Sequence, residues 1–185
     1  MSKFKLINTY LDGLIIGERK PYIDKRGSFS RIFCALELED IFPLNSLKTQ
    51  INMSHTIDIG VVRGMHYQIP PSAEKKIVLC MRGAISDTIV DIRKNSATFL
   101  KSYTINLEEN DNRMVFIPEG FAHGFQTLSD NCTLVYIHNV SYSVEHERGL
   151  NPLDPFLGIN WPLPISYLSE KDSHRPFISK SFSGV

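Results

Sequence analysis

Two short segments of the chain combine a histidine with other polar groups, VVRGMHYQIPP at 61–71 and PEGFAHGF at 118–125. The first segment predicts a strand that runs into a proline-broken loop, and strand alternation places Arg63 and His66 on opposite faces of it. In the second segment, one proline and two glycines shape a turn that presents His123. A histidine in a sheet is a satisfied core residue, a metal ligand or a proton-transfer group.

Metal binding needs more ligands than these segments supply. A site with mixed nitrogen and oxygen ligands normally has three or more good donors. The first segment offers only one imidazole, His66, beside Tyr67 and Gln68, and the second adds His123. The sequence therefore predicts no metal site.

Each candidate residue also has a structural interpretation. A lone histidine in a strand, such as His66, is more often structural than catalytic. Asp172 stands three residues after Ser169, the spacing of a capping box at a helix start. Tyr136 fits a core aromatic whose hydroxyl is satisfied, and Lys76 fits a solvated loop lysine. Residue types alone leave both interpretations open.

The elements that position these residues are short strands. Segments rich in β-branched and aromatic residues recur between turn residues, at 76–83, 86–93, 101–107, 113–118 and 133–143. Their regular spacing indicates an antiparallel β-sandwich or barrel. We expect a short helix at 37–43 and a helical turn at 166–174. The chain then forms a single all-β domain, 1–185, with irregular ends.

Composition excludes several classes of partner. Twenty basic and twenty acidic residues give a formal net charge of zero, so no overall field attracts nucleic acid or an anionic membrane. No apolar run approaches the length of a membrane span, and the first residues lack a secretory signal. The three cysteines are far apart and form no CxxC pair, which favours reduced thiols and a cytoplasmic location.

Several motifs in the same order resemble one known family. The stretch GVVRGMHYQIPPSAEKKIVLCMRGAISDTIVDIRKNSATF is followed by IPEGFAHGFQTLSD, LVYIHNVSYSVEHERGLNPLDPFLGINWP and LSEKD. Together they resemble the dTDP-4-dehydrorhamnose 3,5-epimerase family over roughly residues 20–175. The resemblance implies a cupin-type double-stranded β-helix, or jelly roll, with short helical segments at the ends.

The same resemblance implies a reaction and its residues. In a nucleotide-linked 4-keto-6-deoxyhexose, the carbonyl acidifies the hydrogens at carbons 3 and 5, so a base forms an enolate and an acid on the other face returns a proton. His66 matches the base, which suits an imidazole, and Asp172 the carboxylate that orients it. Lys76 matches the cation at the developing oxyanion, and Tyr136 the proton donor. No cofactor or metal is implied.

Substrate contacts follow from the resemblance as well. Arg26 and Arg63 match the arginines on the phosphate side, where a guanidinium binds oxygens bidentately. The other matched residues contact the nucleotide or lie near it: Gln50, Asn52, His123, Tyr142 and Glu147. The family also implies a homodimer in which an N-terminal strand pairs with the partner's sheet and carries Arg26 to the partner's site.

Two departures from the family pattern leave the nucleotide open. The chain has Arg31 where the pattern has a carboxylate, and QIN places Ile51 where the pattern has aspartate. Both fall in segments assigned to the nucleotide side, so CDP- or GDP-linked 4-keto sugars are alternatives to dTDP. The resemblance also implies a place in a deoxysugar or surface-polysaccharide pathway, such as synthesis of the O-antigen of lipopolysaccharide. A metal-dependent cupin, a non-catalytic sugar-nucleotide binder and a sugar ketoisomerase are the alternatives to an epimerase.

Overall fold

The computed structural model describes residues 2–44 and 47–185, and nearly all of its regular structure is strand. The strands are β1 (Phe4–Asn8), β2 (Ile15–Arg19), β3 (Tyr22–Asp24), β4 (Gly27–Phe29), β5 (Gln50–Thr56), β6 (Val61–Gln68), β7 (Lys76–Arg82), β8 (Ala84–Asp91), β9 (Ser102–Glu108), β10 (Arg113–Ile117), β11 (Phe121–Thr127), β12 (Cys132–His138), β13 (Glu147–Gly149) and β14 (Tyr167–Leu168). Two short helices are α1 (Ala35–Leu38) and α2 (Glu170–Ser173).

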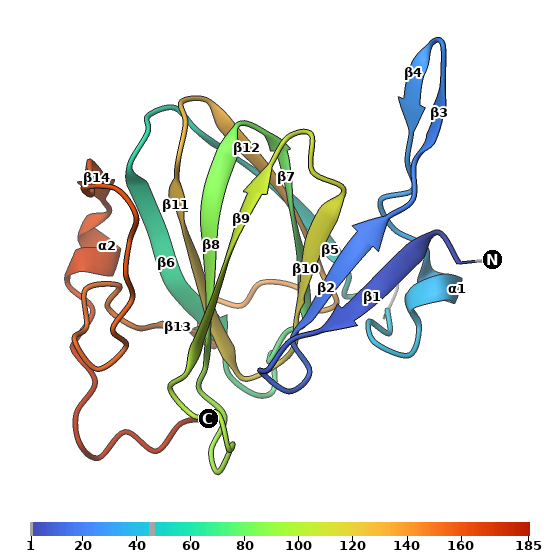
Figure 1. Cartoon of the computed structure of the whole chain (residues 1–185). Helices are drawn as coiled ribbons and strands as arrows, with labels where there is room; N and C mark the ends of the chain where they lie inside the picture. The colour runs from blue at the N-terminus through green and yellow to red at the C-terminus, as the bar shows by residue number, and fades with distance from the viewer. Residues whose placement is uncertain (1, 45–46) are drawn as a thin grey trace.

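Two sheets face each other across the molecule (Figure 1). The first sheet has the order β1-β2-β10-β7-β12-β5, and all of its pairs are antiparallel. The second has the order β13-β6-β11-β8-β9, with β14 added in parallel to β6. From β5 to β8 and again from β9 to β13 the chain alternates between the two sheets, as in a jelly roll, which confirms the predicted all-β architecture.

The main core lies between the sheets, and alternation along each strand fills it. In β7, Val78 and Cys80 point into this core, whereas Ile77 and Leu79 point to the outer face. Both faces of β7 are buried, which explains why its sequence is a continuous apolar run. Because both sheets contribute to one core, we infer that the chain forms the single domain predicted from its length.

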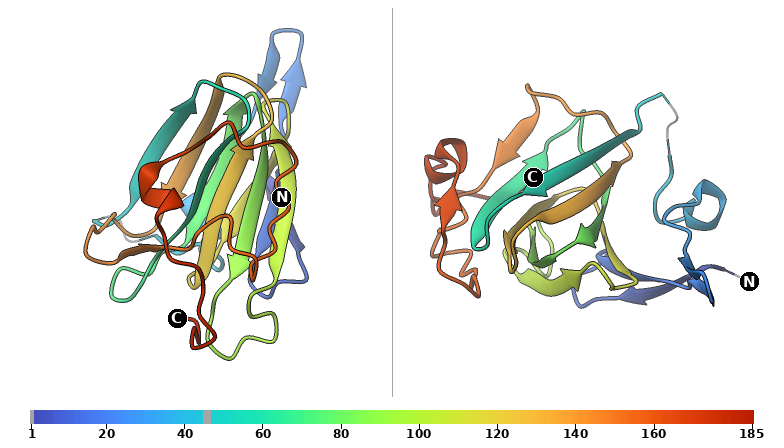
Figure 2. Two further views of the ribbon diagram at one scale, coloured as in Figure 1. Left: turned by 90° about the vertical axis from the view of Figure 1, so that its left-hand side faces the viewer. Right: turned by 90° about the horizontal axis from the view of Figure 1, so that it is seen from above.

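The outer faces are covered by the two ends of the chain. On the first sheet, Leu38 and Phe42 of the α1 segment pack against Ile77 and Phe116. On the second sheet, the segment that follows β13 packs onto Met65 and its neighbours, with Leu157 and Ile178 buried there. Figure 2 shows the red C-terminal segment running along this side of the barrel. This segment brings α2 to the flank of β6.

Most predicted strands are present within one or two residues. The strand predicted at 133–143 ends at His138, because the next residues bond to other loops: Asn139 Oδ1 accepts the Lys75 amide at 2.7 Å, and the Ser143 amide donates to Gln68. The helix expected at 37–43 is α1, which begins two residues earlier and is shorter. The helical turn expected at 166–174 is α2.

The predicted facing of Arg63 and His66 is wrong. In the β6–β11 ladder His66 pairs with His123, but Arg63 pairs with Phe125, so β6 has one more residue than β11 between these pairs. This extra residue is a β-bulge, and it reverses the alternation. Gly64 lies in the bulge with φ of +137°, and a Cβ there would be 2.5 Å from Cα of Gly124. Arg63 and His66 consequently face the same cavity.

The β3–β4 hairpin stands apart from the two sheets (Figure 1). Tyr22, Ile23 and Phe29 on it are exposed, at 66%, 72% and 78%. Among the described residues, no helix is long and apolar enough to cross a lipid bilayer.

Candidate active site

A cavity of about 620 Å³ opens between the two sheets and is closed on one side by α2. It receives side chains from β5, β7 and β12 of the first sheet and from β6, β11 and β13 of the second. Ten of the eleven residues matched by sequence line it: Gln50, Asn52, Arg63, His66, Lys76, His123, Tyr136, Tyr142, Glu147 and Asp172. Residues from seven separated segments therefore meet in one place.

His66 and Asp172 form a hydrogen-bonded pair at the edge of this cavity, with Nε2 of His66 2.7 Å from Oδ1 of Asp172. Ser169 is the N-cap of α2, and its Oγ accepts the Asp172 amide at 3.1 Å. Burial raises the pKa of Asp172, but the His66 bond and charge lower it by more, so the net pKa lies below its ordinary value. The carboxylate therefore stays ionised and can orient and stabilise the imidazole.

The second histidine has its own carboxylate. Nε2 of His123 lies 2.7 Å from Oδ1 of Asp87, and both side chains are almost completely buried. Burial lowers the pKa of His123, and Asp87 opposes this effect only in part. A fixed, neutral imidazole on β11 thus sits beside the more exposed imidazole of His66, its cross-strand partner.

Tyr136 lies on β12, in the sheet opposite His66, and lines the same cavity. Its hydroxyl is 3.5 Å from Oγ of Ser54, and its ring contacts His123 edge-on at 6.3 Å. Burial raises the pKa of Tyr136 well above its ordinary value, so the phenol remains protonated at neutral pH. A protonated phenol and an imidazole from opposite sheets can act on two faces of one ligand.

Lys76 begins β7 and reaches the cavity with a side chain that is only 6% exposed. Its Nζ lies 3.2 Å from Oε1 of Glu74, in the loop before the strand. The solvated lysine that residue type suggested is therefore not observed. A buried ammonium can stabilise negative charge that develops on a nearby oxygen.

Polar side chains continue toward the cavity mouth. Gln50 donates to Oδ1 of Asn52 at 2.9 Å, and its own oxygen accepts the amide of Tyr142 at 2.9 Å. Nε of Arg63 donates to Oγ1 of Thr56 at 3.0 Å, which leaves the rest of its guanidinium available for an anion.

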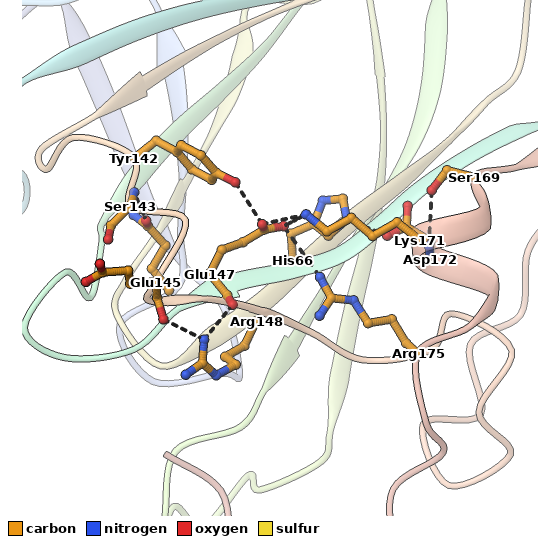
Figure 3. Close-up of polar contacts among 11 residues, drawn as sticks. His66, Tyr142, Ser143, Glu145, Glu147, Arg148, Ser169, Lys171, Asp172 and Arg175 are labelled. Atoms are coloured by element: carbon orange, nitrogen blue, oxygen red, sulfur yellow. Dashed lines mark hydrogen bonds and ion pairs between the residues drawn. The ribbon is translucent and has the colours of Figure 1, made fainter.

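Tyr142 is anchored at the mouth by a charged cluster (Figure 3). Its hydroxyl donates to Oε2 of Glu147 at 2.8 Å. Lys171 of α2 contacts the same carboxylate at 2.5 and 2.7 Å, and Arg175 approaches it at 3.5 Å. The hydroxyl of Tyr142 is thus fixed while the residue stays 51% exposed, and an exposed aromatic ring can stack on an aromatic ligand.

Comparison with known proteins shows which family the chain resembles. The sequence profile described as dTDP-4-dehydrorhamnose 3,5-epimerase matches residues 8–180. The chain belongs to this family. A protein of that name from Sinorhizobium fredii is 40% identical over 185 residues, covering 95% of this chain and 93% of the relative. The family resemblance seen in the sequence is confirmed, and the chain belongs among the sugar epimerases, which are isomerases.

Solved structures of the family share the fold. A Legionella pneumophila dTDP-6-deoxy-D-glucose-3,5-epimerase, in complex with dTDP-4-keto-L-rhamnose, aligns with a TM-score of 0.86 at 37% identity, covering 94% of this chain and 92% of that one. A 3′-monoepimerase from Streptomyces bikiniensis, in complex with dTDP-quinovose, aligns with a TM-score of 0.83 at 31% identity, covering 91% and 85%. The cupin-type jelly roll predicted from the sequence is confirmed.

Three residues predicted for the substrate region lie elsewhere within this chain. Arg26 is on the β3–β4 hairpin, where its guanidinium pairs with Asp24 at 2.6 Å. Arg31 pairs with Glu37 near α1. Ile51 is 67% exposed and alternates with the cavity-lining Gln50 and Asn52. Arg31 and Ile51 therefore do not line the cavity of a single chain, although both neighbours of Ile51 do.

The family motifs did not assign three residues of charged or imidazole type that line the cavity, Glu74, His138 and Lys171. His138 stands two positions after Tyr136 on β12, so strand alternation alone places it on the same face. Glu74 and Lys171 are within two positions of Lys76 and Asp172. The histidines and carboxylates of the cavity form pairs, and no group of three or more His, Cys, Asp or Glu suited to a metal occurs in 2–44 and 47–185.

Proposed function

We propose that this protein epimerises carbon 3, carbon 5 or both in a nucleotide-linked 4-keto-6-deoxyhexose, with His66 as base and Tyr136 as acid. The observation that carries the proposal is the pairing of His66 with Asp172 on one wall of a cavity whose other wall presents the partly buried phenol of Tyr136. A planar enolate held between them would lose a proton to one wall and gain one from the other.

The steps can be assigned to named groups. Nε2 of His66 contacts Asp172, so its other ring nitrogen, Nδ1, takes the proton from the carbon beside the ketone. The electron pair of the broken C–H bond moves to the ketone oxygen, where Lys76 stabilises the enolate. Tyr136 protonates the same carbon on the opposite face, and the imidazolium and phenolate then exchange protons with solvent. The negative charge of Asp172 stabilises the imidazolium throughout.

A thymidine diphosphate is our proposed carrier of the sugar. The support is the similarity to the Legionella enzyme, whose structure contains dTDP-4-keto-L-rhamnose. The exposed ring of Tyr142 offers stacking for the base, Gln50 and Asn52 offer amides, and Arg63 offers a guanidinium for the diphosphate. CDP- and GDP-linked sugars are the alternatives, and comparing deuterium exchange among the nucleotide sugars distinguishes them.

We further propose a homodimer in which the β3–β4 hairpin places Arg26 at the partner's cavity. Support comes from the three exposed apolar side chains of this projecting hairpin and from the open edge of β5, which a partner strand would cover. Sedimentation should give a dimer at micromolar concentration. Mixing the Arg26→Ala and His66→Ala variants should give more activity than either variant alone, because one site of the mixed dimer is intact. A fully active monomer would contradict this arrangement.

One experiment tests the reaction. The protein is incubated in heavy water with the 4-keto-6-deoxyglucose derivatives of dTDP, CDP, GDP and UDP, and deuterium at carbons 3 and 5 is followed by proton NMR. We expect exchange and inversion with the dTDP sugar, and the positions exchanged show whether one or both carbons react. Conversion to a 3-keto sugar would instead indicate a ketoisomerase, and loss of activity after chelation would indicate a metal-dependent cupin.

We also propose a cytoplasmic place in deoxysugar synthesis for a surface polysaccharide. The support is that Cys34, Cys80 and Cys132 are all free thiols, as expected in a reducing compartment. Thiol labelling of the protein in intact cells should find all three reduced.

A further inference from the structure

Glu74 occupies a position in the cavity that the proposed reaction does not use. Its side chain is only 11% exposed and lies between three donors. Oε1 accepts from Nζ of Lys76 at 3.2 Å, and Oε2 accepts from Nδ1 of His138 at 2.7 Å and from Nε2 of Gln68 at 3.3 Å. Both carboxylate oxygens are therefore held, and one of them holds Lys76.

His138 connects this carboxylate to the nucleotide side of the cavity. It pairs with Lys76 on β7 and with Gln50 on β5, so it lies between the two strands. Its Nε2 is 3.5 Å from Nδ2 of Asn52, and its ring stacks on Tyr136 at 6.1 Å and 23°. With Nε2 accepting from Asn52 and Nδ1 donating to Glu74, a chain of hydrogen bonds leads from the Asn52 amide through His138 to the Glu74 carboxylate, which also accepts from Lys76.

The charges favour a fixed ion pair over a mobile lysine. Burial raises the pKa of Glu74, but Lys76 and His138 lower it by more, to about 2, so the carboxylate is ionised at neutral pH. An ammonium that is 6% exposed would be costly without this anion. Without it, we expect the Lys76 side chain to turn away from the reacting oxygen.

We propose that Glu74 is a positioning residue that fixes the Lys76 ammonium toward the substrate ketone, and that His138 orients the Glu74 carboxylate. This inference rests on the proposed function, in which Lys76 stabilises the enolate oxygen. Lys76 acts mainly on charge that develops in the transition state, so errors in its position lower kcat more than they raise KM.

A double-mutant cycle tests the proposal. Wild type, Glu74→Gln, Lys76→Met and the double variant are compared by kcat and KM for inversion of the dTDP sugar, after circular dichroism has established that each is folded. We expect Glu74→Gln to lower kcat about tenfold or more and to change KM less than about threefold. In the Lys76→Met background the same substitution should change kcat less than about twofold, because its effect passes through Lys76.

Two further variants separate positioning from a structural role. His138→Phe keeps the ring that stacks on Tyr136 but removes the donor to Glu74, and it should lower kcat only when Lys76 is present. It also supplies the test if Glu74→Gln does not fold. Glu18→Gln is the matched control, since Glu18 forms an exposed pair with Lys5 at 2.9 Å. It should leave kcat unchanged.

The possible results separate the positioning role of Glu74 from the proposed epimerase function. Equal losses with and without Lys76, or an unchanged kcat in Glu74→Gln, would overturn the positioning role while the epimerase assignment stands. A wild-type protein that exchanges no proton of any nucleotide sugar in the panel would overturn both.

Discussion

His66 and Asp172 are 106 positions apart in the chain, yet they share a hydrogen bond of 2.7 Å. Asp172 serves two purposes in this arrangement. Its backbone amide donates to the N-cap Ser169 and helps to start α2, while its carboxylate reaches His66. The capping position indicated by the sequence is therefore observed, and the same residue also bonds to the proposed base.

We predict that His66→Ala abolishes deuterium uptake at both carbons, because no enolate forms without the base. His66 is half-exposed, so the loss of the imidazole should leave the fold intact by circular dichroism. His55→Ala is the control, since this exposed histidine on β5 contacts Thr133 outside the cavity. Near-normal exchange in His66→Ala would mean that the base is another group, with His123 the next candidate.

Tyr136→Phe should separate exchange from inversion. His66 can still remove a proton and return it to its own face, so deuterium uptake should persist while inversion is lost or confined to one carbon. The two quantities are read from the same proton NMR experiment. Loss of both in a folded variant would place Tyr136 in the proton abstraction step.

Arg63→Ala should raise KM about tenfold or more with little change in kcat, because a phosphate contact acts in ground and transition states alike. Arg82→Ala provides a comparison, since Arg82 is at the far end of β7 and outside the cavity. Steady-state kinetics check the prediction. A large fall in kcat at unchanged KM would assign Arg63 to the chemical steps instead.

Gly64→Ala should destabilise the fold by about 3 kcal/mol, from overpacking and an unfavourable backbone conformation together. The new Cβ would meet Cα of Gly124 at 2.5 Å and the carbonyl of His123 at 2.9 Å. Gly158→Ala shares a positive φ but meets no atom nearer than 4.0 Å, so it should cost clearly less. Urea unfolding measures both, and equal costs would contradict the close approach of β6 and β11.

Acid should weaken the contribution of Glu74 to stability. Its pKa in the folded protein, about 2, lies below the ordinary value of 4.5, so the carboxylate stabilises the fold above about pH 4.5. That contribution, about 3 kcal/mol in full, is lost as the pH falls toward 2. The difference in unfolding free energy between wild type and Glu74→Gln should therefore shrink between pH 5 and pH 3, and a constant difference would contradict the prediction.

The sequence by itself determined the strands and the family. Runs such as that of β7 are apolar because both faces are buried, and this pattern is local, so it is readable without the fold. Motif order then identified ten residues that the structure places around one cavity. Both kinds of information depend on residue type and spacing alone.

Tertiary structure decided which side chains meet. The bulge in β6 turned Arg63 to the side of His66, and only the pairing of β6 with β11 reveals it. The contacts of Glu74 with Lys76 and His138 depend on how a loop before β7 meets the end of β12. Alternation and propensity act over a few residues, whereas hydrogen-bond partners and bulges are set by strands that pair across the whole chain, so their geometry appears only after folding.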